Sequence, residues 1–211
     1  MWRMEQVLDL YAQPYDPARP VVCFDEVSKE LHADVRPRVP AAPGRAQRED
    51  YEYQRRGTAN LFMFCCPLRG WRHVSVTPQR TYQEVARQWR ALVDVHFPRA
   101  TEIQLVLDNL NTHTPGALYE TFAPDEAQRI LKRLTLVYTP KHASWLNMAE
   151  MEWSVLTRQV LDQRIPDMAT LKRATTRWTR QRNAAKTKIN WCFRTSKARI
   201  KLEHLYPSTI K

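Results

Sequence analysis

Short apolar runs alternate along the chain with stretches whose apolar residues recur every three or four positions. The runs are rich in β-branched and aromatic residues, which is typical of buried strands. Five of them predict strands: VVCFDEV (21–27), NLFMFCCPL (60–68), WRHVSVT (71–77), IQLVLD (103–108) and LTLVYT (134–139). An Arg69-Gly70 turn between the second and third runs predicts a hairpin.

Helical periodicity fills the intervals between these runs. Thr81 and Glu84 form the two ends of a capping box, and apolar residues follow at helical spacing as far as His96. Further helices are expected at residues 4–11, 115–133, 144–163 and 167–183. Early strands followed by alternating helices and strands predict an α/β fold, with a mixed sheet flanked by helices.

Proline-rich and charged segments divide the chain into three expected regions. Residues 1–20 are predicted to hold a short helix and a linker with three prolines. Residues 21–190 contain all the predicted strands and are expected to form one domain, followed by a basic, aromatic tail at residues 191–211. Within the domain, residues 32–50 are rich in proline, arginine and charge, and predict a mobile loop or an irregular arm.

The positive charge of the chain is confined to its last quarter. Residues 157–211 contain 14 Lys and Arg against 3 Asp and Glu, whereas residues 1–156 contain 19 of each, so the whole excess of +11 lies in the later segment. A local basic surface suits a polyanion such as nucleic acid, because each neutralised phosphate releases counterions. The alternative is a solvated basic helix that keeps the protein soluble.

Cysteine usage and hydropathy restrict the class of protein. The four cysteines lack the paired spacing of a zinc site and are predicted to be free structural thiols. No stretch approaches the roughly 18 apolar residues of a membrane span. Glu5 and Asp9 lie where a signal peptide needs an apolar core. We therefore expect a cytoplasmic protein with no membrane partner.

Two predicted strands end on an aspartate, Asp25 in the first and Asp108 in the fourth. Acidic side chains are rarely buried unless they are paired or bind a cation. Two such carboxylates on neighbouring strands would suit Mg²⁺, which prefers hard oxygen ligands. The alternative is that each aspartate only caps a turn.

A third carboxylate is expected on the helix after Pro140, where Glu150 and Glu152 are the candidates. On a helical wheel, an apolar stripe runs from Trp145 to Val160, and Glu152 lies nearer its centre than Glu150. Amphipathicity therefore favours Glu152 as the residue that faces inward. Both residues remain compatible with an ordinary charged helix surface.

Three motifs occur in a fixed order along the chain: VVCFDE, LVLDNLNTHT and YTPKHASWLNMAE. Together they resemble the bacterial insertion-sequence transposases of the Tc/mariner superfamily, which are DDE transposases with a ribonuclease-H-like catalytic domain. The likeness extends from about Val21 to Pro207 and includes DYEYQRRGTANLFMF and the terminal INWCF…ARIKL. It implies that residues 21–190 are a ribonuclease-H-like DDE catalytic domain.

The resemblance implies metal-dependent cleavage and joining of DNA strands. Asp25, Asp108 and Glu150 match the catalytic carboxylates that would hold two Mg²⁺ ions, with Mn²⁺ able to substitute. The match to Glu150 conflicts with the helical wheel, which favours Glu152. Asn109 and His113 match polar positions that orient the metal ligands or phosphates, or that cap the strand.

The implied partner is double-stranded DNA, at the element's ends and at the target, with the protein acting as a homodimer and associated with the nucleoid when bound. Contacts with DNA phosphates are expected from one basic face of the last long helix and the residue that follows it. Its members are Arg173, Arg177, Arg180 and Lys186. The alternative is a basic face that only contacts solvent.

Two departures from the family pattern leave other functions open. The 41 residues between Asp108 and Glu150 exceed the compact family spacing, and only about twenty residues precede the first strand, where helix-turn-helix modules are expected. One alternative is a catalytically incomplete DNA-binding fragment that acts with or against a full-length partner. Another is a different ribonuclease-H-like nuclease, which acts on RNA in hybrids or on DNA junctions.

Overall fold

A five-stranded mixed sheet forms the centre of the computed structural model, which describes residues 1–48 and 50–206. The strand order is β3-β2-β1-β4-β5, with β2 antiparallel to its neighbours β1 and β3, and with β4 and β5 parallel to β1. The strands are β1 (Val21–Asp34), β2 (Tyr53–Cys66), β3 (Trp71–Thr77), β4 (Ile103–Leu107) and β5 (Leu134–Tyr138). The predicted mixed α/β sheet is therefore confirmed.

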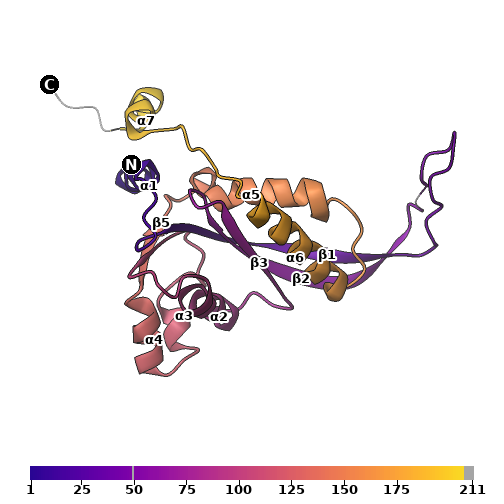
Figure 1. The fold of residues 1–211 in the computed structure, drawn as a ribbon, viewed down its shortest axis with the longest axis horizontal. Helices are drawn as coiled ribbons and strands as arrows, with labels where there is room; N and C mark the ends of the chain where they lie inside the picture. Colours follow the sequence, from indigo (N-terminus) through magenta and orange to yellow (C-terminus); the bar gives the residue numbers. More distant parts are fainter. Residues whose placement is uncertain (49, 207–211) are drawn as a thin grey trace.

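The hairpin of β1 and β2 is much longer than the apolar runs predicted. Its outer half pairs residues as far as Asp34 and Tyr53, with a register shift between Glu30 and His32. Beyond it, isolated bridges link Val39 to Arg48 and Ala42 to Arg45, so the segment expected as a mobile loop or irregular arm continues the ribbon. Figure 1 shows this ribbon projecting from one end of the molecule. The apolar pattern did not predict the outer half of this ribbon, because its backbone pairing continues where the side chains are exposed.

One face of the sheet is covered by α2 (Tyr82–Ala91), α3 (Gly116–Tyr119) and α4 (Pro124–Leu131) (Figure 1). The Thr81 hydroxyl accepts a hydrogen bond from the backbone N–H of Glu84, as the capping box predicts, but the Glu84 carboxylate pairs with Arg87 instead of reciprocating. A π-helical turn (Leu92–His96) extends α2. The single helix expected at residues 115–133 is two short helices, because Pro124 starts a new helix at its first turn.

The other face is covered by α5 (Met148–Leu156) and α6 (Met168–Ala184), as Figure 1 shows. The helix expected at residues 144–163 begins late. A 3₁₀ turn (Ser144–Leu146) comes first, and a π-helical turn (Thr157–Leu161) follows α5. Trp145 consequently lies outside α5 and is 47% exposed, so it does not belong to the predicted apolar stripe. On α6, Leu171, Thr175 and Trp178 are buried.

The two ends of the described chain pack against each other. Helix α1 (Trp2–Ala12) lies beside α7 (Thr195–Lys201) (Figure 1). Arg199 donates two hydrogen bonds to Glu5 at 2.8 and 2.9 Å, and the Tyr206 hydroxyl donates a third at 2.8 Å. The segment from α7 to Tyr206 therefore packs against α1 at the surface of the core.

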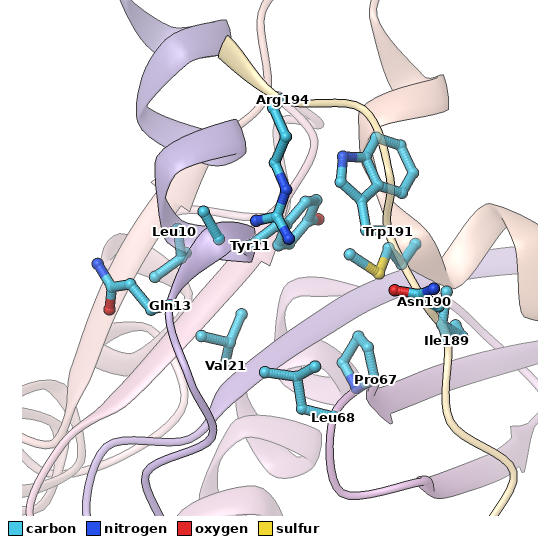
Figure 2. Close-up of a pocket in the computed structure, with 12 residues that line it drawn as sticks. Leu10, Tyr11, Gln13, Val21, Pro67, Leu68, Ile189, Asn190, Trp191 and Arg194 are labelled. Atoms are coloured by element: carbon cyan, nitrogen blue, oxygen red, sulfur yellow. The ribbon is translucent and has the colours of Figure 1, made fainter. Parts of the chain in front are cut away.

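A small cavity of about 100 Å³ lies between α1, the ends of β1 and β2, and the segment that leads to α7 (Figure 2). Tyr11, Val21, Leu68 and Trp191 line it, and the Arg194 side chain reaches into it. Cys23, Cys65 and Cys66 are buried free thiols, as predicted, and Cys192 is an exposed free thiol. Within residues 1–48 and 50–206, no helix combines the length and apolarity needed to span a bilayer.

Candidate active site

Asp25 and Asp108 lie at equivalent positions relative to two adjacent strands. Asp108 directly follows β4, as predicted, but the prediction that the first strand ends on Asp25 is wrong, because β1 continues to Asp34. β1 and β4 are parallel, and Cys23 pairs with Val106. Asp25 comes two residues after Cys23, and Asp108 comes two residues after Val106. Because side chains alternate along a strand, both aspartates point to the face that Cys23 and Val106 share with the start of α5. The sheet thus brings together two carboxylates that are 83 residues apart in the sequence.

Glu150 joins this edge from the first turn of α5. The turn is fixed by Asn147, whose side-chain oxygen accepts from the backbone N–H of Ala149 at 3.1 Å. The amide nitrogen of Asn147 donates to the carbonyl of Phe24 at 2.8 Å. Since Phe24 directly precedes Asp25, this one buried side chain holds the start of α5 against the first candidate carboxylate.

Negative charge accumulates at Asp25. Burial, followed by the charges of Glu150, Glu26 and Asp108, raises the pKa of Asp25 to about 8. A carboxyl in this position takes up a proton at neutral pH unless a cation compensates the surrounding charge. The site therefore has the electrostatics that a divalent cation relieves.

The donor types fit Mg²⁺ or Mn²⁺, since three carboxylates supply the hard oxygen ligands that these ions prefer. Across residues 1–48 and 50–206, however, no three His, Cys, Asp or Glu side chains already converge with the spacing of a metal-ligand cluster. The carboxylates share an edge of the sheet without forming a closed coordination shell. The roles of Asp25, Asp108 and Glu150 as ligands remain predictions.

Glu152 faces inward, as the helical wheel predicted, but its carboxylate is already paired. It is 2% exposed, and Arg72 of β3 donates to it at 2.6 Å. Arg182 of α6 donates to the same carboxylate at 2.9 and 3.1 Å. Glu152 therefore links α5, α6 and β3 as a buried ion pair. Glu150 is the acidic residue of α5 whose charge acts on Asp25.

The loop after β4 holds Asp108 in a defined orientation. Its Oδ1 accepts from the backbone N–H of Leu110 at 3.0 Å and from Nδ1 of His113 at 2.7 Å. The hydrogen bond from His113, together with that from Leu110, outweighs partial burial and lowers the pKa of Asp108. Asp108 thus makes the turn contact that a strand cap makes, and Oδ2 accepts no hydrogen bond from the described residues.

Asn109 and His113, both expected near Asp108, contact different partners. Asn109 donates to the carbonyl of Thr139 at 2.6 Å, and its side-chain oxygen accepts from Arg3 of α1 at 2.9 Å. Asn109 therefore ties the loop to the end of β5 and to α1. His113 is fully buried, and its ring contacts Asp108 directly.

Glu26 is a site residue that the sequence interpretation missed. Its Oε2 lies 2.8 Å from Nε2 of His113, and the two side chains are 4% and 1% exposed. Burial alone lowers the pKa of His113, but the hydrogen bonds to Asp108 and Glu26 more than offset it and raise the pKa to about 9. The signal in the sequence was a second acidic residue directly after Asp25 in an otherwise apolar strand.

An open hollow of about 340 Å³ lies beside Asp108, between the loop after β4 and the loop after β5. Lys141 and His142 line it from the second loop. His142 has φ 60°, a left-handed conformation that is uncommon for residues other than glycine. The hollow offers space next to the carboxylates that a substrate group can enter.

The residues predicted to contact DNA lie on the outer side of α6 and just beyond it. Arg173, Arg177, Arg180 and Lys186 are all exposed. Arg177 also lines a groove between α6 and the π-helical turn that follows α5. These positions are accessible to a polyanion, and contact with DNA stays a prediction.

Three solved structures of the Mos1 transposase have a similar fold. The paired-end complex with the left transposon end matches with a TM-score of 0.57 and 14% identity, over 84% of this chain and 54% of that chain. The mariner paired-end complex with Mn matches with a TM-score of 0.56 and 14% identity, over 90% of this chain and 62% of that one. The corresponding complex with Mg matches with a TM-score of 0.52 and 13% identity, over 90% and 61%.

At this level of identity the likeness shows the fold, which is the ribonuclease-H-like mixed sheet of the Mos1 catalytic domain. The chain spans less than two thirds of the Mos1 chains that it matches. No curated protein matches this sequence. The model of the DDE superfamily endonuclease domain, however, matches residues 20–172, which is most of the chain. The chain therefore belongs to the DDE superfamily endonucleases.

Proposed function

We propose that this chain is the catalytic domain of a DNA transposase of the bacterial insertion-sequence type within the Tc/mariner superfamily. The observation that carries the proposal is the gathering of Asp25, Asp108 and Glu150 at one edge of the sheet, where uncompensated negative charge raises the pKa of Asp25 to about 8. Membership of the DDE endonuclease family supports a reaction on DNA strands. The Mos1 structures, determined with Mn, with Mg and with transposon ends, support the same reaction class.

In the proposed reaction, Asp25, Asp108 and Glu150 hold two Mg²⁺ ions, for which Mn²⁺ can substitute. Bound there, the ions would neutralise charge on the scissile phosphate and activate the attacking oxygen. Asp25 would hold the ions as a carboxylate, so binding would require loss of its proton. Asn147 and His113 contribute by fixing where Glu150 and Asp108 lie. Positioning and charge stabilisation are the main contributions of protein groups to phosphoryl transfer.

DNA binding is assigned in this proposal to Arg173, Arg177, Arg180 and Lys186, which would neutralise phosphates along the exposed side of α6. The active form is proposed to be a homodimer on double-stranded DNA. Cleavage would expose a 3′-hydroxyl at the element's end, which then attacks the target strand.

A second candidate is a DNA-binding fragment that acts with or against a full-length partner. The observation that favours it is the row of exposed basic side chains on α6, which can bind DNA phosphates whether or not the carboxylates hold metal. This candidate predicts DNA binding without metal-dependent cleavage.

Nicking of supercoiled plasmid by the purified chain separates the two candidates. The proposal predicts nicking that depends on Mg²⁺ or Mn²⁺ and is lost in Asp108→Asn. If wild type and variant bind DNA yet neither cuts it with either metal, the fragment interpretation replaces the proposal. RNA–DNA hybrids in the same assay test for a ribonuclease-H-like nuclease with another substrate.

A further inference from the structure

A chain of two hydrogen bonds links Glu26 to Asp108 through the ring of His113. Nε2 of His113 lies 2.8 Å from Oε2 of Glu26, and Nδ1 lies 2.7 Å from Oδ1 of Asp108. The Glu26 and His113 side chains are 4% and 1% exposed, whereas that of Asp108 is 40% exposed. Glu26 and His113 are thus shielded from water, whereas Asp108 reaches the open hollow beside β4.

The two hydrogen bonds connect side chains from opposite faces of the sheet. Glu26 follows Asp25 on β1, so its side chain points to the face that is covered by α2, together with Phe24. The loop after β4 carries His113 around the end of that strand, and the ring packs against Phe24 with centroids 5.1 Å apart. The Tyr138 hydroxyl donates to the carbonyl of His113 at 2.7 Å. The imidazole is therefore held from β1, and the backbone of His113 is held from β5.

The consequence for Asp108 is a fixed carboxylate. Oδ1 is held by His113 and by the N–H of Leu110, so Oδ2 is the oxygen left to face the other carboxylates. Without Glu26, the His113 ring keeps only one of its two side-chain hydrogen bonds. The ring can then turn, and the carboxylate of Asp108 can turn with it.

We propose that Glu26 is a positioning residue that orients Asp108 as a metal ligand through the buried ring of His113. The inference rests on the proposed function, because it assigns Asp108 to a metal site. It adds a residue for which neither the family match nor the fold assigns a role. His113 is the direct hydrogen-bond partner of that ligand, and loss of such a partner changes metal affinity by about 10- to 100-fold in other metal sites.

The test is a titration of the DNA-free full chain with Mn²⁺, followed by calorimetry or electron paramagnetic resonance. Glu26→Ala removes the hydrogen bond, and Glu26→Asp keeps the charge but shortens the reach. Glu26→Gln keeps a side chain that can bond Nε2. The matched control is Glu30→Ala, which breaks another Glu–His pair on β1, the exposed contact of Glu30 with His32 at 3.1 Å.

The inference predicts that Mn²⁺ affinity falls about tenfold or more in Glu26→Ala and Glu26→Asp. Affinity falls less in Glu26→Gln, which keeps the hydrogen bond but removes a charge near Asp25, and it stays close to wild type in Glu30→Ala. A purely structural role for Glu26 would change thermal stability and leave the Mn²⁺ affinity of the folded variants unchanged. Should the alanine variant fail to fold, the Mn²⁺ affinity of the aspartate variant decides between the two roles.

Three results overturn the inference. If folded Glu26→Ala or Glu26→Asp binds Mn²⁺ as tightly as the wild type, Glu26 has no positioning role, while the proposed metal site still stands. An equal loss in Glu26→Gln assigns the effect to charge instead of the hydrogen bond. If the wild-type chain itself binds no Mn²⁺, the metal site of the proposed function fails, and this inference fails with it.

Discussion

At the scale of single residues, the pair Glu150 and Glu152 shows why burial is a poor guide to chemistry. The more buried glutamate is neutralised by Arg72 and Arg182, whereas the exposed one acts on Asp25. A helical wheel can identify the inward residue but not its partner. The partners come from β3 and α6, which are remote in the sequence.

Glu152→Ala should reduce the free energy of unfolding by about 3–5 kcal/mol, because it leaves two buried or half-buried guanidinium groups without their shared carboxylate. Glu150→Gln should leave the free energy of unfolding unchanged and abolish DNA nicking. Chemical denaturation of both variants measures the first effect. Equal loss of stability in the two variants would show that the assignment of structural and chemical roles is wrong.

His96 gives a pH dependence whose sign follows from its burial. Burial, then the nearby charge of His73, lowers the pKa of His96 to about 4 from 6.5. Below pH 6.5 the unfolded chain binds this proton more readily than the folded one, so its contribution to stability is complete above pH 6.5 and is lost as the pH falls toward 4. The Tm of the wild type should therefore fall more steeply across this window than that of His96→Gln. Parallel curves would contradict the account.

At the scale of secondary-structure elements, the sequence was sufficient for strands that are buried on both faces. The outer half of the β1–β2 ribbon was missed because its exposed side chains carry no apolar pattern. The breaks before α4 and α5 were missed because the periodicity continues through Pro124 and Asn147. The strand pattern supplied Asp25 and Asp108 as candidates, and the family resemblance favoured Glu150 over Glu152 as the third carboxylate.

The contact between Glu26 and His113 could not be predicted from local pattern, since the two residues are 87 positions apart. It depends on the loop after β4 bringing His113 against β1 at Glu26. A tertiary contact of this kind follows from how strands are ordered in the sheet, and residue spacing carries no record of that order. The same reason explains why Arg72 and Arg182 were not recognised as partners of Glu152.

Asn147 couples a helix cap to the candidate site. Asn147→Ala should cost about 1–2 kcal/mol of stability through loss of the cap. It should also reduce nicking, because α5 loses its hydrogen bond to Phe24 beside Asp25. Asp167→Ala is the matched control, since Asp167 caps α6 through Thr170 at 2.7 Å. A control that loses as much nicking as Asn147→Ala would disprove the coupling.

At the scale of the whole molecule, charge is separated between two surfaces. Carboxylates gather where β4 ends beside Asp25 of β1, while the outer side of α6 carries exposed arginines. The arginines of α6 would attract a polyanion to this surface. The carboxylates would repel its phosphates unless cations lie between them. This separation is what a metal-dependent enzyme acting on DNA requires.

Charge reversal at Arg173 and Arg177 should weaken DNA binding and lower the slope of log affinity against log salt by about 2, since each lost phosphate contact reduces the slope by about 1. Lys132→Glu is the control, because Lys132 is exposed beyond α4 on the other face of the sheet. Fluorescence anisotropy across a salt series measures both quantities. An unchanged slope in the double variant would exclude this face from DNA binding.

The central claim, that Asp25, Asp108 and Glu150 together hold the metal ions, is tested most directly by iron-mediated cleavage of the protein itself. Fe²⁺ bound in place of Mg²⁺ generates hydroxyl radicals that cut the nearest backbone when ascorbate and peroxide are added. The account predicts cuts clustered around residues 25, 108 and 150, suppressed by excess Mg²⁺ and absent in Asp108→Asn. Cuts spread evenly along the chain, or clustered at other segments, would contradict it.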